Sequence, residues 1–170
     1  MKQIRPSDQT AKSGTSLLGK SILLCATAGG IGYFPIFPGT VGTLAAVPIS
    51  FGLNRLAAVS LLLAGVTLVV AIFFAIHLST RAAVLLQQKD PAAIVIDEVV
   101  GFLAANFAAP STPAGLITTF LLFRFFDIAK VFPASRLERL PGGAGIVLDD
   151  VMAGIYTFAV MRLLLAWGMP

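Results

Sequence analysis

Residues 56–76 read LAAVSLLLAGVTLVVAIFFAI, a run of 21 residues without a charged side chain. Roughly 20 apolar residues are enough for an α-helix to cross the hydrocarbon core of a bilayer. The run therefore predicts a membrane-spanning helix, and it indicates that the protein is a helical membrane protein.

The composition of the whole chain points to the same class. Of its 170 residues, 57% are hydrophobic and only 12% are charged, whereas soluble domains carry roughly 25% charged residues. Strand signals are weak, and glycine and alanine are frequent inside the apolar segments, as in helices that pack closely in membranes. We predict an all-α, multi-helix integral membrane bundle, with a polar N-terminal tail at 1–16 and a single helical domain at 17–170.

The remaining segments predict further helices separated by breaks. Prolines and glycines in 29–50 are expected to prevent a regular helix before about Val41, and residues 31–53 are predicted to be re-entrant. The other expected elements are a short amphipathic helix at 16–28, an amphipathic connector at 77–90, helices at 91–109, 114–130 and 149–167, and a polar basic loop at 131–145.

Five of the eight acidic residues lie within or at the mouth of apolar helices, where ionisable groups usually mark a functional site. These residues are Asp97, Glu98, Asp127, Asp149 and Asp150. Asp127 has Arg124 and Lys130 three residues to either side, so it can be neutralised locally. The two adjacent pairs have no local base, and they therefore predict a cation from elsewhere.

The chemistry of the donors favours Mg²⁺ as that cation. Mg²⁺ takes oxygen ligands and commonly keeps a substrate phosphate in its shell. Zinc prefers cysteine or histidine, and the chain offers only Cys25 and His77. We therefore predict that the metal ligands come from the two adjacent pairs, at 97–98 and 149–150.

Small residues follow the acids at helical spacing. Asp97 is followed by Gly101, Ala104 and Ala108, and Asp150 is followed by Gly154 and Thr157. Each acid thus begins a stripe along which another helix can pack tightly. Such stripes explain the glycines as packing residues, but they do not explain the acids.

Two glycine-rich loops precede helices, FPIFPGTVGT at 34–43 and GGAGIVLDD at 142–150. Backbone N–H groups at helix N-termini bind anions, although each loop alone is equally consistent with a plain turn. Together with Arg124 and Lys130 they predict a phosphate site that includes Gly39, Thr40, Gly142, Gly143 and Gly145. Thr40 fits a helix N-cap as well as a donor to phosphate.

Four motifs in this order resemble the phosphatidylglycerophosphatase A family. They are PIFPGTVG at 35–42, IVIDEVVG at 94–101, FRFFDIAKVFP at 123–133 and GGAGIVLDDVMAG at 142–154. The chain departs from the family pattern at Val131, where a proline is usual, and at Glu138, where an aspartate is frequent. Both departures lie outside the acid pairs.

The resemblance implies an enzyme that removes the terminal phosphate of phosphatidylglycerophosphate to give phosphatidylglycerol, with Mg²⁺ required. On this basis Asp97, Glu98, Asp149 and Asp150 are expected to bind the metal and activate water. Arg124 and Lys130 are expected to hold the phosphate, with Asp127 as a further ligand or as their orienting group. Attack by a bound water and attack by an aspartate carboxylate both remain open.

Other phosphatase chemistries lack their residues in this chain. Cys25 is not followed by the arginine of a cysteine phosphatase, since Ile31 stands there, and a lone His77 does not provide a histidine-based site. An aspartyl-nucleophile DxDx(T/V) motif is absent from the sequence, and so is the DGxxAR segment of CDP-alcohol phosphotransferases. The alternative from another class is a small ion-coupled transporter component, in which buried acids relay ions.

Charge distribution bears on partners and orientation. The net charge is +4, but the basic residues form no dense patch with interleaved aromatics, so nucleic acid is not an expected partner. The basic tail and the 129–141 loop favour the inside of the membrane. We therefore expect a multi-pass protein of the bacterial inner membrane, with the lipid bilayer as its surroundings and the active site at the cytoplasmic face.

Overall fold

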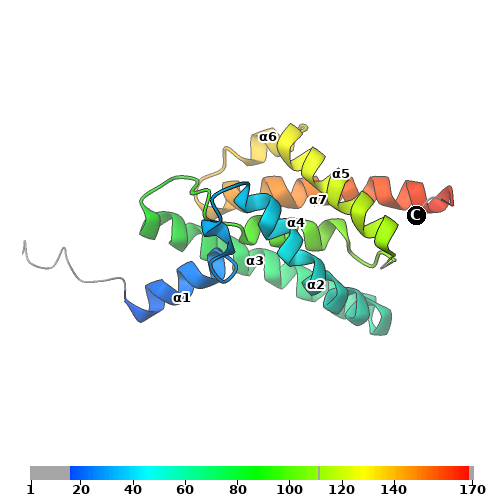
Figure 1. Ribbon diagram of the computed structural model, residues 1–170, viewed down its shortest axis with the longest axis horizontal. Coiled ribbons are helices and arrows are strands. Elements are labelled where there is room, and N and C mark those ends of the chain that lie inside the picture. Colours follow the sequence, from blue (N-terminus) through cyan, green and yellow to red (C-terminus); the bar gives the residue numbers. More distant parts are fainter. Residues whose placement is uncertain (1–15, 111, 169–170) are drawn as a thin grey trace, which may run out of the picture.

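The computed structural model describes residues 16–110 and 112–168, and this part of the chain is helical without strands. The elements follow the order shown in Figure 1. They are α1 (Leu17–Ala26), η2 (Ile31–Tyr33), α2 (Pro38–Val59), α3 (Leu61–Leu86), α4 (Ile96–Ala105), α5 (Pro113–Ala129), α6 (Ala134–Leu137) and α7 (Gly143–Ala166). The all-α prediction is confirmed. The polar tail predicted at 1–16 lies outside the described residues, except for Ser16, which caps α1.

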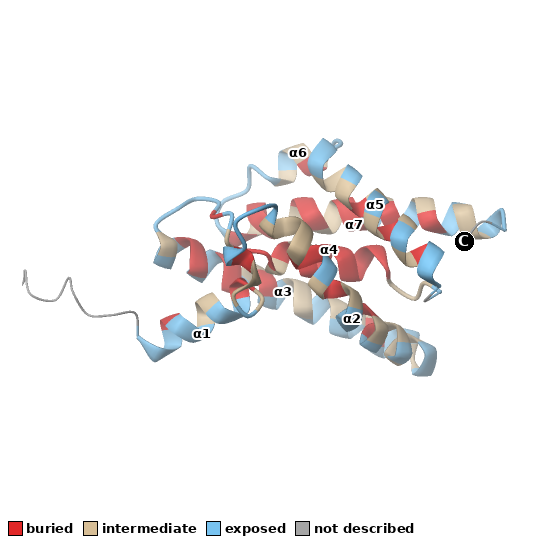
Figure 2. Cartoon of the chain, viewed as in Figure 1, coloured by how far each residue is buried: buried red, intermediate tan, exposed pale blue. Residues whose placement is uncertain are grey.

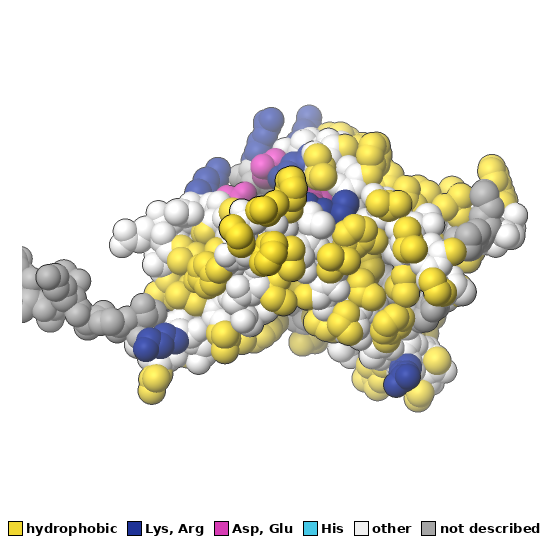
Figure 3. Space-filling view, in the orientation of Figure 1, with side chains coloured by type: hydrophobic (Ala, Val, Ile, Leu, Met, Phe, Trp, Pro, Cys, Tyr) yellow, Lys and Arg dark blue, Asp and Glu magenta, His cyan; other side chains and the backbone are white. Residues whose placement is uncertain are grey.

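Three helices, α2, α3 and α7, are long and apolar enough to cross a membrane. Many large hydrophobic side chains on them face outward, including Val70, Phe73 and Leu163. Figure 3 shows such side chains over much of the visible surface. In a membrane protein this surface contacts lipid, because the bilayer interior is as apolar as the side chains themselves.

Helices α2, α4 and α7 all begin at one end of the bundle, and α3 and α5 return to that end (Figure 1). As a result, the connections at 27–37, 87–95 and 130–142 lie at the same end, which we call the site end. The α2–α3 connection and residues 106–110 lie at the opposite end. This arrangement gathers residues that are far apart in the sequence.

The apolar run at 56–76 does not form a single helix, contrary to the prediction. Ser60 is extended, with φ −154° and ψ 109°, and its hydroxyl accepts a hydrogen bond from Leu63 N at 3.2 Å. It therefore ends α2 and caps α3, as serine often does at helix N-termini. Helix α3 continues from this break to Leu86, so most of the segment predicted to be a connector, 77–90, is helical.

The proline-rich segment is also more regular than predicted. Helix α2 begins at Pro38 rather than near Val41, because proline is well tolerated in the first turn. It continues through Pro48 to Val59, so a long continuous helix replaces the predicted re-entrant segment. The closing helix α7 likewise begins at Gly143, six residues before its predicted start, and the 131–145 loop contains the short α6.

Helix α4 is shorter than the predicted 91–109, and it lies in the centre of the bundle (Figure 2). Its Phe102 is fully buried and packs edge to face on Phe123 of α5, with ring centroids 6.0 Å apart. With ten residues it spans only about 15 Å. It is therefore enclosed by protein and is not a membrane-spanning element.

Polar side chains from other helices satisfy the backbone where α4 ends. Asn54 accepts a hydrogen bond from Ala108 N at 2.9 Å, and Arg162 donates to the carbonyl oxygens of Phe107 and Ala108 at 2.8 Å. The side-chain amide of Asn106, the C-cap residue of α4, donates to the side chain of Ser50, with Nδ2 2.9 Å from Oγ. Irregular backbone is tolerated at membrane depth only when it is satisfied in this way.

Candidate active site

The crossing of α4 and α7 brings the two acidic segments together. A Cβ on Gly101 would lie 2.8 Å from the carbonyl oxygen of Asp150, and a Cβ on Gly154 would overlap the carbonyl oxygen of Gly101. Only glycines permit this approach of two backbones. Asp97 and Asp150 each lie one turn before one of these glycines, so the close crossing places both carboxylates side by side. The packing role predicted for Gly101 and Gly154 is confirmed, whereas Ala108, predicted to lie on the same stripe as Gly101, lies beyond the end of α4.

Asp97, Glu98 and Asp150 form a cluster in which one carboxylate oxygen from each lies within 4.8 Å of the others. Asp97 and Asp150 are buried. Asp97 Oδ1, Glu98 Oε2 and Asp150 Oδ2 are inaccessible to solvent and have no hydrogen-bond partner among the described residues. Buried oxygens of this kind are costly unless a cation compensates them, and a divalent metal ion fits this donor set.

The environment of Asp97 also favours a compensating cation. Burial raises the pKa of its carboxyl group well above the usual range, and the nearby charges of Glu98 and Asp150 raise that pKa further. Like charges at this separation disfavour simultaneous ionisation. A bound cation would reverse this effect and allow all three carboxylates to be ionised.

Arg124 extends from α5 toward the cluster. Its Nη1 lies 2.6 Å from Asp127 Oδ2 and 4.0 Å from Glu98 Oε1, so the predicted local pairing with Asp127 is present. The short contact does not have hydrogen-bond geometry, and Nε and Nη1 are buried without an acceptor in the part of the chain that is described. The negative charges of Asp127 and Glu98 thus hold the guanidinium in place, and its Nε remains able to donate a hydrogen bond to an anion.

Lys130 lies six residues after Arg124, as the C-cap residue of α5. Its Nζ donates to Asp149 Oδ2 at 2.8 Å and lies 3.0 Å from Glu138 Oε1. These two carboxylates raise the pKa of Lys130 despite its partial burial, so it stays protonated. Asp149, expected to bind metal with its neighbour, is placed beside the cluster and is paired with this lysine.

The five predicted acids, Arg124 and Lys130 line one open pocket of about 270 Å³ at the site end. Figure 3 shows acidic and basic groups gathered at this edge of the molecule. The lining residues are Phe37, Pro38, Gly39, Asp90, Pro91, Ala92, Ile94, Asp97, Glu98, Arg124, Asp127, Lys130, Ile146, Asp149 and Asp150. The structure thus brings all five predicted acids and both predicted bases together.

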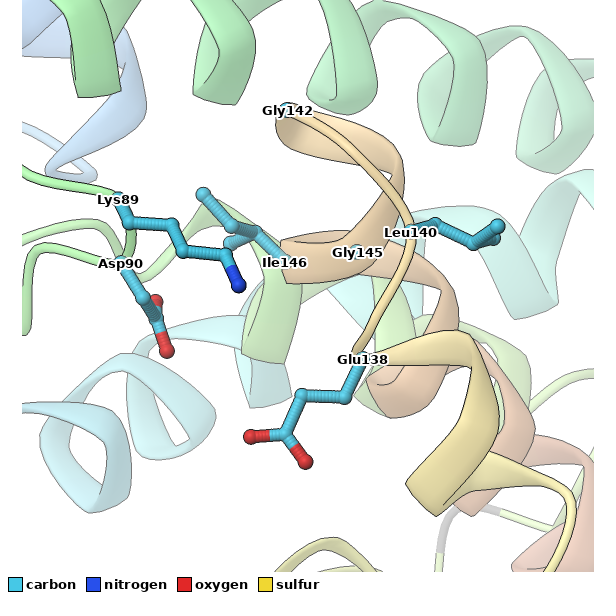
Figure 4. Close-up of a pocket in the computed structure, with 7 residues that line it drawn as sticks. All are labelled: Lys89, Asp90, Glu138, Leu140, Gly142, Gly145 and Ile146. Atoms are coloured by element: carbon cyan, nitrogen blue, oxygen red, sulfur yellow. The ribbon is translucent and has the colours of Figure 1, made fainter.

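Asp90 was missed by sequence reasoning. It lines this pocket and also a smaller neighbouring one of about 20 Å³, shown in Figure 4 between the 87–95 connection and the 138–146 segment. Because it lies in a polar connector, it lacks the contrast with apolar surroundings that marked the other acids. Its position directly before Pro91, at the end of a helix-breaking segment, was the only available signal.

The glycines predicted to bind phosphate are placed differently from one another. Gly39 lines the pocket, and a Cβ there would overlap Glu98 Oε1, so this glycine allows α2 to approach the cluster. Gly142 and Gly145 line the smaller pocket, with Gly142 at φ +64°. Gly143 packs on α3 and donates its N–H to Thr80 Oγ1 at 2.9 Å. Thr40 is not among the residues that line either pocket.

Three helix N-termini meet at this pocket, those of α2, α4 and α7. Asp97 and Glu98 lie in the first turn of α4. The positive end of a helix dipole stabilises negative charge within the first turn. The ends of these helices therefore favour both the ionised acids and an anionic ligand such as a phosphate.

Comparison with known proteins gives a consistent result. A model of the phosphatidylglycerophosphatase A family matches residues 24–165. Phosphatidylglycerophosphatase A of Haemophilus influenzae is 34% identical over 148 residues, covering 86% of this chain and 90% of the relative. The Escherichia coli protein of that name is 30% identical over 140 residues, covering 81% and 80%.

A further relative has another name. A Bacteroides thetaiotaomicron protein, provisionally named a phosphatidylinositol-3-phosphatase, is 34% identical over 143 residues, covering 82% of this chain and 90% of the relative. No solved structure is significantly similar to the chain. The comparisons give no support to the transporter alternative.

Proposed function

The chain belongs to the phosphatidylglycerophosphatase A family and is a phosphatase, and on that premise we propose that it hydrolyses phosphatidylglycerophosphate with Mg²⁺ held by Asp97, Glu98 and Asp150. The observation that supports this most strongly is the set of three buried, unpartnered carboxylate oxygens in a pocket that also presents Arg124. The three carboxylate oxygens and Arg124 Nε have no hydrogen-bond partner within the described residues. A metal–phosphate complex would satisfy both.

The reaction replaces the bond between phosphorus and the glycerol oxygen by a bond to the oxygen of water, and the glycerol oxygen takes up a proton. Mg²⁺, when bound, supplies positive charge that polarises the phosphate oxygens. Arg124 would bind the phosphate with Nε, which has no acceptor among the described residues, as one of its donors. Planar guanidinium groups suit this task because they bind two oxygens at once.

Asp149 is suited to receive the proton of the attacking water. Its Oδ2 is held by Lys130, whereas its buried Oδ1 has no hydrogen-bond partner in the described chain. Lys130 therefore fixes the orientation of Asp149 and leaves its other carboxylate oxygen without a partner. Direct attack by an aspartate remains the competing route, and transfer of ¹⁸O from labelled water into an enzyme carboxylate during one turnover would support it.

Phosphate release by the purified protein tests the proposal. Wild-type protein should release phosphate from phosphatidylglycerophosphate only when Mg²⁺ is present, and Asp97→Asn, Glu98→Gln and Asp150→Asn should each lower kcat by about 100-fold or more, since each weakens the charge stabilisation of the transition state. Asp8→Asn, the same change in the tail, is the control and should keep wild-type activity. Activity in EDTA, or in all three variants, would contradict the proposed metal site.

Because the Bacteroides relative is named for an inositol lipid, the headgroup that this protein prefers has to be tested separately. Phosphatidylinositol 3-phosphate should be assayed beside phosphatidylglycerophosphate under the same conditions. We propose that the glycerol headgroup is preferred, because the family model and two of the relatives bear that name. A higher kcat/KM for the inositol lipid would overturn this preference without affecting the proposed metal site.

We also propose that the site end faces the cytoplasm of a bacterial inner membrane. Among the described residues, seven of nine Lys and Arg side chains belong to elements at the site end. Only Arg55 and Arg162 lie toward the opposite end, near the start of α3 and the end of α7. Basic residues concentrate on the cytoplasmic side of membrane proteins.

A further inference from the structure

An exposed apolar segment, residues 33–37, leads directly into the catalytic pocket. Tyr33, Phe34, Ile36 and Phe37 are each more than half exposed, and Phe37 is 75% exposed. Phe37 also lines the pocket that holds Arg124 and the acidic cluster. The segment therefore joins an apolar surface to the site of phosphate chemistry.

The backbone of Phe37 makes its aromatic side chain unexpected. Phe37 has φ 53° and ψ 56°, in the left-handed region, and it precedes Pro38 at the start of α2. Residues with a bulky side chain are rare there, whereas glycine and asparagine adopt the conformation with little strain. A large ring that is three-quarters exposed gains little from packing inside the protein, so packing does not explain its presence at a strained position.

A second exposed apolar segment follows another residue that lines the pocket. Lys130 lines the pocket, and the residues after it, Val131 and Phe132, are exposed. The Arg136 guanidinium lies 4.9 Å from the centre of the Phe132 ring. Aromatic side chains interspersed with basic groups are typical of the membrane–water interface. Both exposed segments next to pocket-lining residues thus have the composition of a surface that meets lipid.

We propose that Phe37 contacts the long acyl chains of the lipid substrate while the phosphate occupies the pocket. This inference rests on the proposed function, because it assumes that the ligand is a phospholipid monoester. Phe37 is then a specificity-determining residue that distinguishes a membrane lipid from a water-soluble phosphate ester. It takes no part in the chemical step.

The inference is tested with two substrates that share one headgroup, dioleoyl and dibutanoyl phosphatidylglycerophosphate, in the same detergent with Mg²⁺. Phe37→Gly should raise KM for the dioleoyl lipid by about tenfold, the effect of losing one buried aromatic contact. KM for the dibutanoyl lipid and kcat for both should stay within about twofold of wild type. Phe37→Asn should behave like Phe37→Gly, because asparagine also adopts the left-handed conformation.

Two further variants separate contact with lipid from damage to the fold. Phe37→Leu keeps an apolar side chain and should retain most of the wild-type KM for the dioleoyl lipid. Phe73→Ala removes a ring that is 68% exposed on α3 and does not line the pocket, so KM should not change. The melting temperature of Phe37→Gly should be no lower than that of wild type, because glycine relieves the backbone strain.

The outcomes distinguish the inference from the function on which it rests. An unchanged dioleoyl KM in both Phe37→Gly and Phe37→Asn would overturn the inference, and so would an equal rise for both lipids. The proposed function would still stand in these cases, because the wild-type protein would release phosphate. Failure of the wild-type protein to act on either lipid would overturn both.

Discussion

At the scale of single residues, Arg124 combines two properties that are usually separate. It is largely buried, and its charge is matched by Asp127, yet Nε retains an unused donor. Burying such donors costs free energy unless a ligand accepts their hydrogen bonds. The arginine is therefore positioned in advance for an anion.

Arg124→Lys should lower kcat/KM for the lipid by about 10- to 100-fold, because an ammonium group keeps the charge but loses the planar pair of donors. The Mg²⁺ concentration that gives half-maximal activity should change little, since the acidic cluster is intact. Steady-state kinetics at several Mg²⁺ concentrations would measure both quantities. Arg81→Lys, on an exposed side chain of α3, is the matched control, and an equal loss there would show that the effect is not specific to the pocket.

Gly39 acts on the cluster through its lack of a side chain. Because a Cβ would overlap Glu98 Oε1, Gly39→Ala should displace that carboxylate and raise the Mg²⁺ concentration needed for half-maximal activity by about tenfold or more, as for other residues that orient metal ligands. Gly52→Ala lies in the same helix, where a Cβ meets nothing within 4 Å. A wild-type Mg²⁺ response in Gly39→Ala would contradict the placement of Glu98 in the metal site.

At the scale of elements, the decisive contact is the crossing of α4 and α7. Gly101 and Gly154 let the two backbones touch, and the acids one turn earlier meet as a consequence. The same crossing encloses α4, whose end is satisfied by Asn54 and Arg162. Packing and metal binding are therefore coupled through one interface.

Gly154→Ala should destabilise the protein by about 1–3 kcal/mol, because the added methyl group overlaps the Gly101 carbonyl and forces the helices apart. It should also reduce the rise in melting temperature that Mg²⁺ produces in the wild-type protein, since Asp97 and Asp150 separate. Gly65→Ala, on α3 where a Cβ meets nothing within 4 Å, should leave both quantities unchanged or slightly improved. Thermal unfolding in detergent with and without Mg²⁺ measures both effects.

The sequence predicted which charged residues gather at one pocket better than it predicted the boundaries of the helices. The acids stood out because carboxylates are rare in apolar surroundings, and the small residues after Asp97 and Asp150 indicated which faces would meet. The break at Ser60 was missed because a single serine inside an apolar run is compatible with a helix. In the structure its hydroxyl caps the first turn of α3.

The pairing of Lys130 with Asp149 lay beyond sequence reasoning for a related reason. Spacing along one helix suggests partners three or four residues apart, and it correctly suggested Arg124 for Asp127. Lys130 instead reaches across to α7, because α5 ends there in a left-handed turn that redirects the chain. Contacts between helices that are distant in sequence require the arrangement of the whole bundle.

At the scale of the whole molecule, the bundle has two chemically different ends. The site end holds the acidic cluster, three helix N-termini and most of the basic residues, whereas the opposite end is mostly apolar. A phosphorylated headgroup has to reach the site end from the aqueous side of one leaflet. The orientation of the bundle therefore decides which leaflet supplies the substrate.

Cysteine labelling in cells measures this orientation, because the chain has one cysteine, Cys25, which can be replaced by serine. In that background, Val59→Cys places an exposed thiol at the opposite end, and Gln88→Cys places one at the site end. We expect a membrane-impermeant maleimide to label Val59→Cys in intact spheroplasts and to label Gln88→Cys only after the membrane is permeabilised. The basic residues at the site end give this direction, because they are retained on the cytoplasmic side. The reverse pattern, in variants that keep phosphatase activity, would place the site on the outer face and require the substrate to come from the other leaflet.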